Sequence, residues 1–258
     1  MRIVVNADDF GLSADTVRAT IDAVTAGHVT SATLMPNAPA SAEAIEFARS
    51  AFGVSFGVHL TFVGDGDERP LSSPQGVPAL VDRAGKLRRT NVVRLAALLG
   101  RLPVEELVRE IEAQVEWARR QGVKVSHVDS HRHLHKYAPF REALARVLPK
   151  LGVRRVRNVQ DVYLRRPLVS PTVWLGGHWH AELIRHFATT DHFYMPATTS
   201  DRSWTALLRR SELEDSTIEV GVHPGEVEEW RLCEARGLAE FARAAAATGH
   251  ELVSWRDI

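Results

Sequence analysis

The stretch VVNADDFG, residues 4–11, ends an apolar, β-branched run with two adjacent carboxylates. Residues 2–7 predict a buried strand, because β-branched and apolar side chains favour strands. Two neighbouring carboxylates repel each other, and each of them needs a partner. Asp8 and Asp9 therefore predict a metal site or a proton-transfer site at the end of this strand.

The rest of the chain alternates strand-like and helix-like runs. Further strands are expected at 29–35, 54–60, 124–128, 154–156, 218–222 and 251–254, with a short one near 192–195. Helices are expected at 13–27, 40–51, 103–121, 139–150, 180–189, 203–210 and 233–248. Segments 61–90 and 158–176 read as long loops, and loops of such length in a compact domain are usually functional.

This alternation predicts an α/β fold, namely an irregular TIM-like (β/α) barrel with about seven parallel strands. An open, doubly wound sheet is the alternative. No Gly-x-Gly-x-x-Gly follows the first strand, which disfavours a dinucleotide-binding fold. No linker divides the chain, so we expect a single domain over residues 1–258.

Composition excludes several classes of protein. Lys+Arg and Asp+Glu both number 32, so no basic excess indicates nucleic-acid binding. No apolar run approaches the ~20 residues that span a bilayer, and no signal-peptide core follows Met1. Cys233 is the only cysteine, so an intrachain disulfide is impossible. We therefore expect a cytoplasmic protein.

Unusual polar residues fall at the same end of several predicted strands. His59 closes the third strand, Asp129 and His131 follow the fourth, and Arg157 follows the fifth. His223 follows the strand at 218–222. In a barrel the C-terminal strand ends form the face that carries active sites, so these side chains and the carboxylate pair should meet there.

The residue types at this face suit a divalent metal. Imidazole and carboxylate together favour Zn²⁺ and other divalent transition metals, whereas Mg²⁺ prefers oxygen ligands. Two histidines and one aspartate leave coordination positions open for water and substrate. The alternative is that His59 and His131 are buried histidines with ordinary hydrogen-bond partners.

The segment from His127 to His135 is dense in imidazole, and its histidines cannot all bind one ion. His131 is our choice of ligand, and Asp129 can orient a ligand through a hydrogen bond. His133 and His135 either line the pocket or lie in the following loop. His127 is expected to pack within the strand.

Five quoted strings carry a resemblance to a known family. They are NADDFG (6–11), VTSATLMPN (29–37), GVHLT (57–61), HVDSHRHLH (127–135) and VHPGE (222–226). They resemble the signature segments of the YdjC-like carbohydrate deacetylases, which include ChbG-type chitooligosaccharide deacetylases and HpnK-like, hopanoid-associated proteins. The resemblance implies a (β/α)-barrel-like hydrolase that removes an N-acetyl group from an amino sugar. It also implies one divalent metal, generally described as Mg²⁺, and frequently a homodimer.

The family's motifs carry over residue by residue. Asp9, His59 and His131 correspond to its metal ligands, and Asp8 is then the candidate base by analogy with other metal-dependent sugar deacetylases. The chain departs from the family at Arg132, where a histidine is usual. A lipid-linked amino sugar as substrate would imply brief contact with a membrane surface.

The remaining candidates complete a mechanism. His223 can protonate the leaving amine, since imidazole does so near neutral pH; its alternative is a surface turn histidine. Arg157, His133 and Asp129 are candidates for binding the substrate, and the alternative for Arg157 is a surface ion pair with Asp161.

Two other functions remain open. A metallophosphoesterase on a similar barrel commonly uses two metals and usually an early His-x-His cluster, where this chain has Asp-Asp. A non-catalytic carbohydrate-binding barrel would not need Asp8 beside a complete ligand set.

Overall fold

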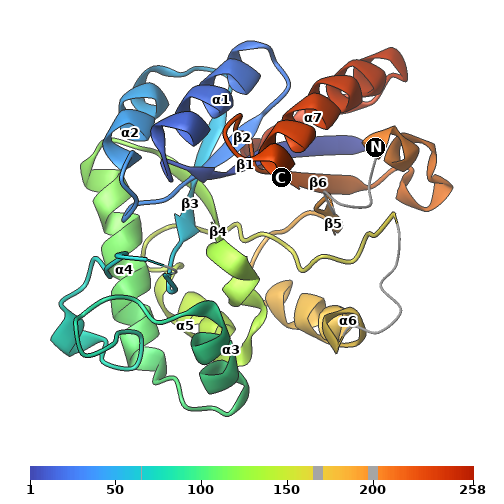
Figure 1. Cartoon of the computed structure of the whole chain (residues 1–258). Coiled ribbons are helices and arrows are strands. Elements are labelled where there is room, and N and C mark those ends of the chain that lie inside the picture. Colours follow the sequence, from blue (N-terminus) through green and yellow to red (C-terminus); the bar gives the residue numbers. More distant parts are fainter. Residues whose placement is uncertain (65, 165–170, 197–202) are drawn as a thin grey trace.

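The computed structural model describes residues 1–64, 66–164, 171–196 and 203–258, and within these the side chains of 171–174 are left aside. Helices surround a curled sheet of parallel strands (Figure 1). The strands are β1 (Arg2–Phe10), β2 (Ser31–Leu34), β3 (Ser55–Leu60), β4 (Val125–Ser130), β5 (His192–Tyr194), β6 (Thr217–Val222) and β7 (Glu251–Val253). The helices are α1 (Ala14–Thr25), α2 (Ser41–Ser50), α3 (Thr90–Leu98), α4 (Val104–Arg120), α5 (Ala138–Val147), α6 (Pro171–Leu183) and α7 (Glu229–Ala247).

The strand order is β4-β3-β2-β1-β6-β5, and β1 lies at the centre. One edge of β1 pairs with β6, while β2 pairs with its second half and β7 with its first three residues. Between β4 and β5, isolated parallel bridges join Val128 to Val156 and Val162 to Tyr194. The sheet therefore curls round as an irregular (β/α) barrel, and the predicted fold class is confirmed.

Several local expectations differ from the structure. Residues 154–156 form isolated bridges rather than a strand, and the helix expected at 180–189 ends at Leu183. Residues Trp204–Arg209 form a 3-10 helix. The sequence did not predict helix α3. No capping residue marks its start, and the helix follows a loop rich in Gly and Pro.

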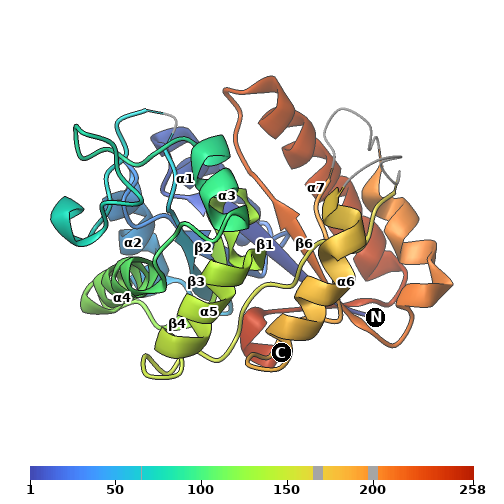
Figure 2. The ribbon, with the colours of Figure 1, turned by 90° about the horizontal axis from the view of Figure 1, so that it is seen from below.

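Trp255 is fully buried beside Ser31 and Ser55, the residues that begin β2 and β3. Both chain termini lie in the lower part of the view in Figure 2. The backbone N–H of Trp255 donates to the hydroxyl oxygens of Ser31 and Ser55, at 3.0 and 3.1 Å. Its indole stacks on the His127 ring, with centroids 4.7 Å apart. The functional residues thus lie at the opposite, C-terminal ends of the strands. Among the described helices, none is long and apolar enough to cross a bilayer.

Candidate metal centre and active-site pocket

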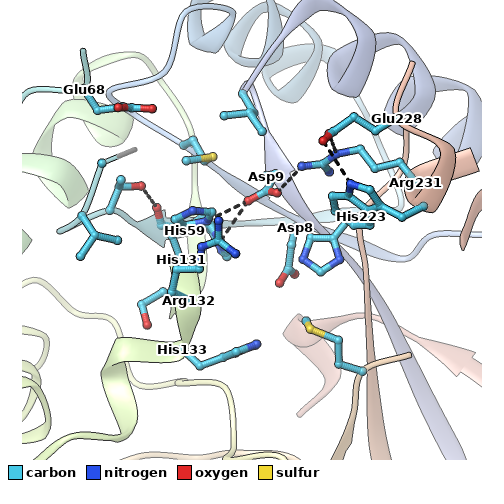
Figure 3. A pocket seen from close by; sticks show the side chains of 18 of the residues that line it. Asp8, Asp9, His59, Glu68, His131, Arg132, His133, His223, Glu228 and Arg231 are labelled. Carbon is cyan, nitrogen blue, oxygen red and sulfur yellow. Dashed lines mark hydrogen bonds and ion pairs between the residues drawn. The ribbon is translucent and has the colours of Figure 1, made fainter. Parts of the chain in front are cut away.

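The end of β1 is irregular, and this irregularity presents both carboxylates to one pocket. Side chains on a regular strand alternate between faces, so Asp8 and Asp9 should point apart. Asp9 instead has a φ of 58°, and the pairing with β2 shifts between Ala7 and Phe10. Aspartate tolerates this left-handed conformation better than most residues. As a result, Asp8 and Asp9 both line the pocket (Figure 3).

Asp9, His59 and His131 bring three potential metal ligands together. Asp9 Oδ1 lies 3.1 Å from His131 Nδ1 and 3.4 Å from His59 Nε2. One ligand atom from each residue lies within 4.8 Å of the other two. This spacing and the mixture of imidazole and carboxylate fit one divalent ion. The sequence had singled out these same three residues as the ligand set.

The second nitrogen of His59 is held by Asp129. His59 Nδ1–H donates to Asp129 Oδ1 at 2.7 Å, and Thr33 Oγ1 donates to Asp129 Oδ2 at 3.1 Å. This arrangement fixes the ring with Nε2 toward Asp9, as is usual for a metal-binding histidine. Burial alone would lower the pKa of His59, but the neighbouring Asp129 raises it to about 10. An arriving metal ion would therefore displace a proton from this ring.

Arg157 is the centre of a buried ionic cluster below the pocket. Its guanidinium donates to both Asp8 oxygens at 2.6 Å and to Glu219 Oε1 at 2.7 and 3.0 Å. Its Nη1 also lies 2.7 Å from Asp129 Oδ2. Arg157 and Asp129 are both fully buried, so the direct contact with substrate that we expected from the sequence does not fit. The alternative pairing of Arg157 with Asp161 is also wrong.

Asp8 is held in its ionised form. Burial would raise the pKa of its carboxyl, but the charge and hydrogen bonds of Arg157 hold the pKa far below its usual range. Asn6 Nδ2 also donates to Asp8 Oδ1, at 2.9 Å. Asp8 Oδ2 accepts one hydrogen bond from the described residues, that of Arg157 Nη1. A carboxylate oxygen has two lone pairs, so Oδ2 can accept another proton or hydrogen bond.

His223 lies on the other side of the pocket and is oriented by Glu234. Glu234 Oε2 accepts from the backbone N–H of His223 at 2.7 Å and from its Nδ1–H at 3.2 Å. Burial would lower the pKa of His223, but the bond with Glu234 raises it above its ordinary value. The ring packs edge-on against Trp230, with centroids 5.4 Å apart. His223 is therefore neither a surface residue nor loosely held.

Arg231 joins the site from α7, and the sequence did not reveal it. Its Nη2 donates to Asp9 Oδ2 at 2.8 Å, and its Nε donates to Glu228 Oε2 at 2.7 Å. The two oxygens of Asp9 thus have separate partners: Oδ1 faces the histidines and Oδ2 faces Arg231. Gly225 leaves room for this side chain, because a Cβ there would lie 2.7 Å from Arg231 Cδ.

The histidines that follow His131 differ in position. His133 lines the pocket with a φ of 54°, and its buried Nδ1 makes no hydrogen bond to any residue that the structure describes. Burial holds the pKa of His133 well below its ordinary value, so the ring is neutral. His135 faces away and is hydrogen-bonded through Nδ1 to Ser130 Oγ at 2.8 Å.

The pocket has a volume of about 580 Å³, which suits a small sugar. Its wall also contains residues that strand-end positions could not reveal, since they come from loops and helices. These are Glu68, Arg94, Glu228, Trp230, Arg231 and Glu234, whereas Leu12, Met35, Arg132 and Met195 lie within two residues of the ends of β1, β2, β4 and β5. The wall combines apolar and charged groups, as a site for a polar organic substrate requires.

Comparison with known proteins identifies the family of the chain. The family described as YdjC-like protein matches residues 2–253. The chain belongs to the YdjC-like family. The resemblance drawn from the sequence strings is therefore confirmed over nearly the whole chain.

Relatives of this YdjC-like chain include two bacterial proteins. One from Halalkalibacterium halodurans, named carbohydrate deacetylase, is 30% identical over 89% of this chain and 87% of its own length. Carbohydrate deacetylase 1 of Listeria innocua is 36% identical over 62% of this chain and 63% of its own length. A crystal structure from Enterococcus faecalis V583, described as a cellobiose-phosphate cleavage protein, has a TM-score of 0.80 at 24% identity. It covers 99% of this chain and 98% of its own, and this likeness supports the fold.

Proposed function

We propose that this YdjC-like chain is a metal-dependent hydrolase that removes the N-acetyl group from an acetylated amino sugar. The observation that carries the proposal is the meeting of three ligand atoms, from Asp9, His59 and His131, beside the ionised Asp8. Its relatives named carbohydrate deacetylase supply the class of substrate. Chitooligosaccharides and lipid-linked glucosamine both fall within that class.

Asp9, His59 and His131 would hold one divalent ion. When bound, such an ion lowers the pKa of water and polarises a carbonyl group. Two imidazoles and one carboxylate favour Zn²⁺, Co²⁺, Ni²⁺ or Mn²⁺ over Mg²⁺. Elemental analysis of protein purified without added metal tests this preference and the site together.

Asp8 would accept the proton of the attacking water. Arg157 keeps its carboxylate ionised, and the remaining lone pair of Oδ2 can receive that proton. The bond with Arg157 also weakens Asp8 as a base, so the proton transfer requires a water that is already acidified. The new C–O bond forms first and leaves a tetrahedral oxyanion on the substrate, and the C–N bond breaks when that oxyanion forms the carbonyl group again.

His223 would donate a proton to the departing nitrogen. Glu234 holds the Nδ1 side of its ring and raises its pKa, which favours the imidazolium form with a proton on Nε2. The amine leaves as a neutral group, and acetate is the second product. Asp8 and His223 thus have opposite roles at the start of the reaction, which suits groups whose pKa values are shifted in opposite directions.

The deciding experiment is acetate release from a panel of N-acetylglucosamine oligomers. We expect acetate and one free amine for each cleaved group. The same protein should release no phosphate from aryl phosphates and sugar phosphates. Phosphate release without acetate would favour a metallophosphoesterase, and sugar binding without either product would favour a non-catalytic barrel.

A further inference from the structure

Helix α3 leaves an apolar face without a partner. Val92, Leu95, Leu98 and Leu99 are each about half exposed or more, between 48% and 63%. The other side of the helix carries the buried Val93 and, at 5% exposed, Ala97. At 100° per residue the four exposed side chains fall within one sector of the helix surface, opposite the buried pair. This surface, Val92–Leu95–Leu98–Leu99, is called the α3 face below.

The stretch of chain that contains α3 is rich in positive charge. From residue 83 to residue 104 the chain has six basic side chains and no Asp or Glu, whereas the whole chain is neutral. The six are Arg83, Lys86, Arg88, Arg89, Arg94 and Arg101. Only Lys86 is paired with a carboxylate, that of Asp67, among the residues that the structure describes. The five arginines therefore keep their charge available for an external anion.

A basic pocket opens at the start of the helix. It measures about 560 Å³ and is lined by Arg89, Thr90, Asn91, Arg94 and Arg132. Two buried side-chain atoms of its lining residues, Thr90 Oγ1 and Arg94 Nε, have no hydrogen-bond partner among the described residues. None of its described lining residues is acidic. The guanidinium groups of Arg89 and Arg94 can donate hydrogen bonds to the oxygen atoms of a phosphate group.

We propose that the α3 face and this basic pocket bind the surface of an anionic lipid membrane. The leucines would enter the interface between headgroups and acyl chains, and the arginines would meet headgroup phosphates. An apolar stripe combined with arginines is the pattern of an interfacial helix. Each basic side chain near such a surface strengthens binding about fivefold.

A second copy of the chain is a poorer occupant of the α3 face. A two-fold interface brings the same patch of both chains together, so the arginines of one copy would face those of the other. Like charges that meet across an interface oppose association. An anionic surface has the complementary charge.

The active-site pocket lies beside this surface. Arg94 and Arg132 line both the basic pocket and the active-site pocket. Docking through α3 would therefore bring the active-site opening close to the lipid. The inference concerns binding alone and does not depend on the proposed deacetylase activity.

Flotation with vesicles tests the proposal directly. The full chain is mixed with vesicles of phosphatidylcholine alone, or with an equal mixture of phosphatidylcholine and phosphatidylglycerol. We expect binding to the mixed vesicles at about 0.1 M salt, and loss of most binding at about 1 M salt. Leu95→Ser with Leu98→Ser should abolish flotation, and Arg89→Gln with Arg101→Gln should weaken binding about 25-fold.

Matched variants elsewhere provide the controls. Leu175→Ser with Ile184→Ser changes two exposed apolar residues, one in α6 and one directly after it, and it should leave flotation unchanged. Arg236→Gln with Arg243→Gln removes two exposed charges of α7, and it should also have no effect. Absence of wild-type binding to the mixed vesicles would overturn the proposal. Self-association that Leu95→Ser with Leu98→Ser abolishes would overturn it as well, because a second copy would then cover the face.

Discussion

Glu219 should weaken the folded state at neutral pH, and its replacement by glutamine tests this expectation. The side chain is fully buried beside Arg157, which Asp8 and Asp129 already neutralise. Glu219 Oε1 accepts hydrogen bonds from Arg157 and from the Trp255 indole, but Oε2 has no hydrogen-bond partner in the part of the chain that the structure describes. Burial accordingly raises the pKa of Glu219 from its ordinary 4.5 to about 7.

The magnitude follows from linkage between protonation and folding. Below pH 4.5 both the folded and the unfolded chain hold this proton, and the group has no effect. As the pH rises toward about 7, the unfolded chain releases the proton while the folded chain retains it, so stability falls. This rise in the pKa corresponds to about 3 kcal/mol of unfolding free energy, and the folded chain loses all of it above pH 7. Glutamine keeps the Oε1 acceptor and does not ionise.

Urea unfolding of the metal-free wild type and Glu219→Gln, at about pH 5 and about pH 8, measures the effect. When the pH is raised from the lower to the higher value, the free energy of unfolding of the variant should increase by about 2–3 kcal/mol relative to that of the wild type. Glu110→Gln is the matched control, because Glu110 is equally buried but accepts N–H groups of Leu71, Ser72 and Gln114. The control should lose about 1–3 kcal/mol at both pH values. A Glu219→Gln variant that is less stable at the higher pH would refute the reasoning.

Three further predictions concern the site and its support. Asp8→Asn should retain metal by elemental analysis and lose at least about 100-fold in acetate release. His131→Ala should lose both the metal and the activity. Full activity of Asp8→Asn would exclude Asp8 as the base. Glu234→Gln should move the alkaline limb of the kcat/KM profile to lower pH. The reason is that the Glu234 carboxylate raises the pKa of His223, which must be protonated to act as the proton donor. An unmoved limb would remove His223 from the mechanism. Gly57→Ala would place a Cβ 2.6 Å from a carbonyl oxygen of β4, so urea unfolding should show a loss of about 1–3 kcal/mol; a stability equal to wild type would contradict that close contact.

Much of the fold could be predicted from sequence because periodicity reports burial directly. The apolar runs at 29–35 and 54–60 contain β2 and β3, and the run at 2–7 forms the first part of β1, since a parallel strand is covered on both faces. The segment 154–156 shows the limit of this signal. Its residues extend alongside β4 but make only isolated bridges, a distinction that depends on how the barrel closes.

The sequence predicted which residues lie at the ends of strands, and therefore near the candidate site. It did not predict the direction in which their side chains point. Asp9, His59 and His131 meet because the carboxyl ends of their strands share one edge. Arg157 follows the same rule of position, yet its side chain points down into the barrel. Sequence position places a residue at an end of the barrel and does not say whether the side chain points outward or inward.

Helix α7 shows a second limit, and it explains how one element can support two halves of the site. Arg231 and Glu234 are three residues apart, so they lie on the same side of the helix. Arg231 holds the metal-ligand carboxylate of Asp9, while Glu234 holds His223. In sequence this pair looks like an ordinary surface ion pair, because only tertiary contact directs the two side chains to different partners. A small rotation of α7 would disturb both partners together, so the position of this helix couples the proposed metal site to the proposed proton donor.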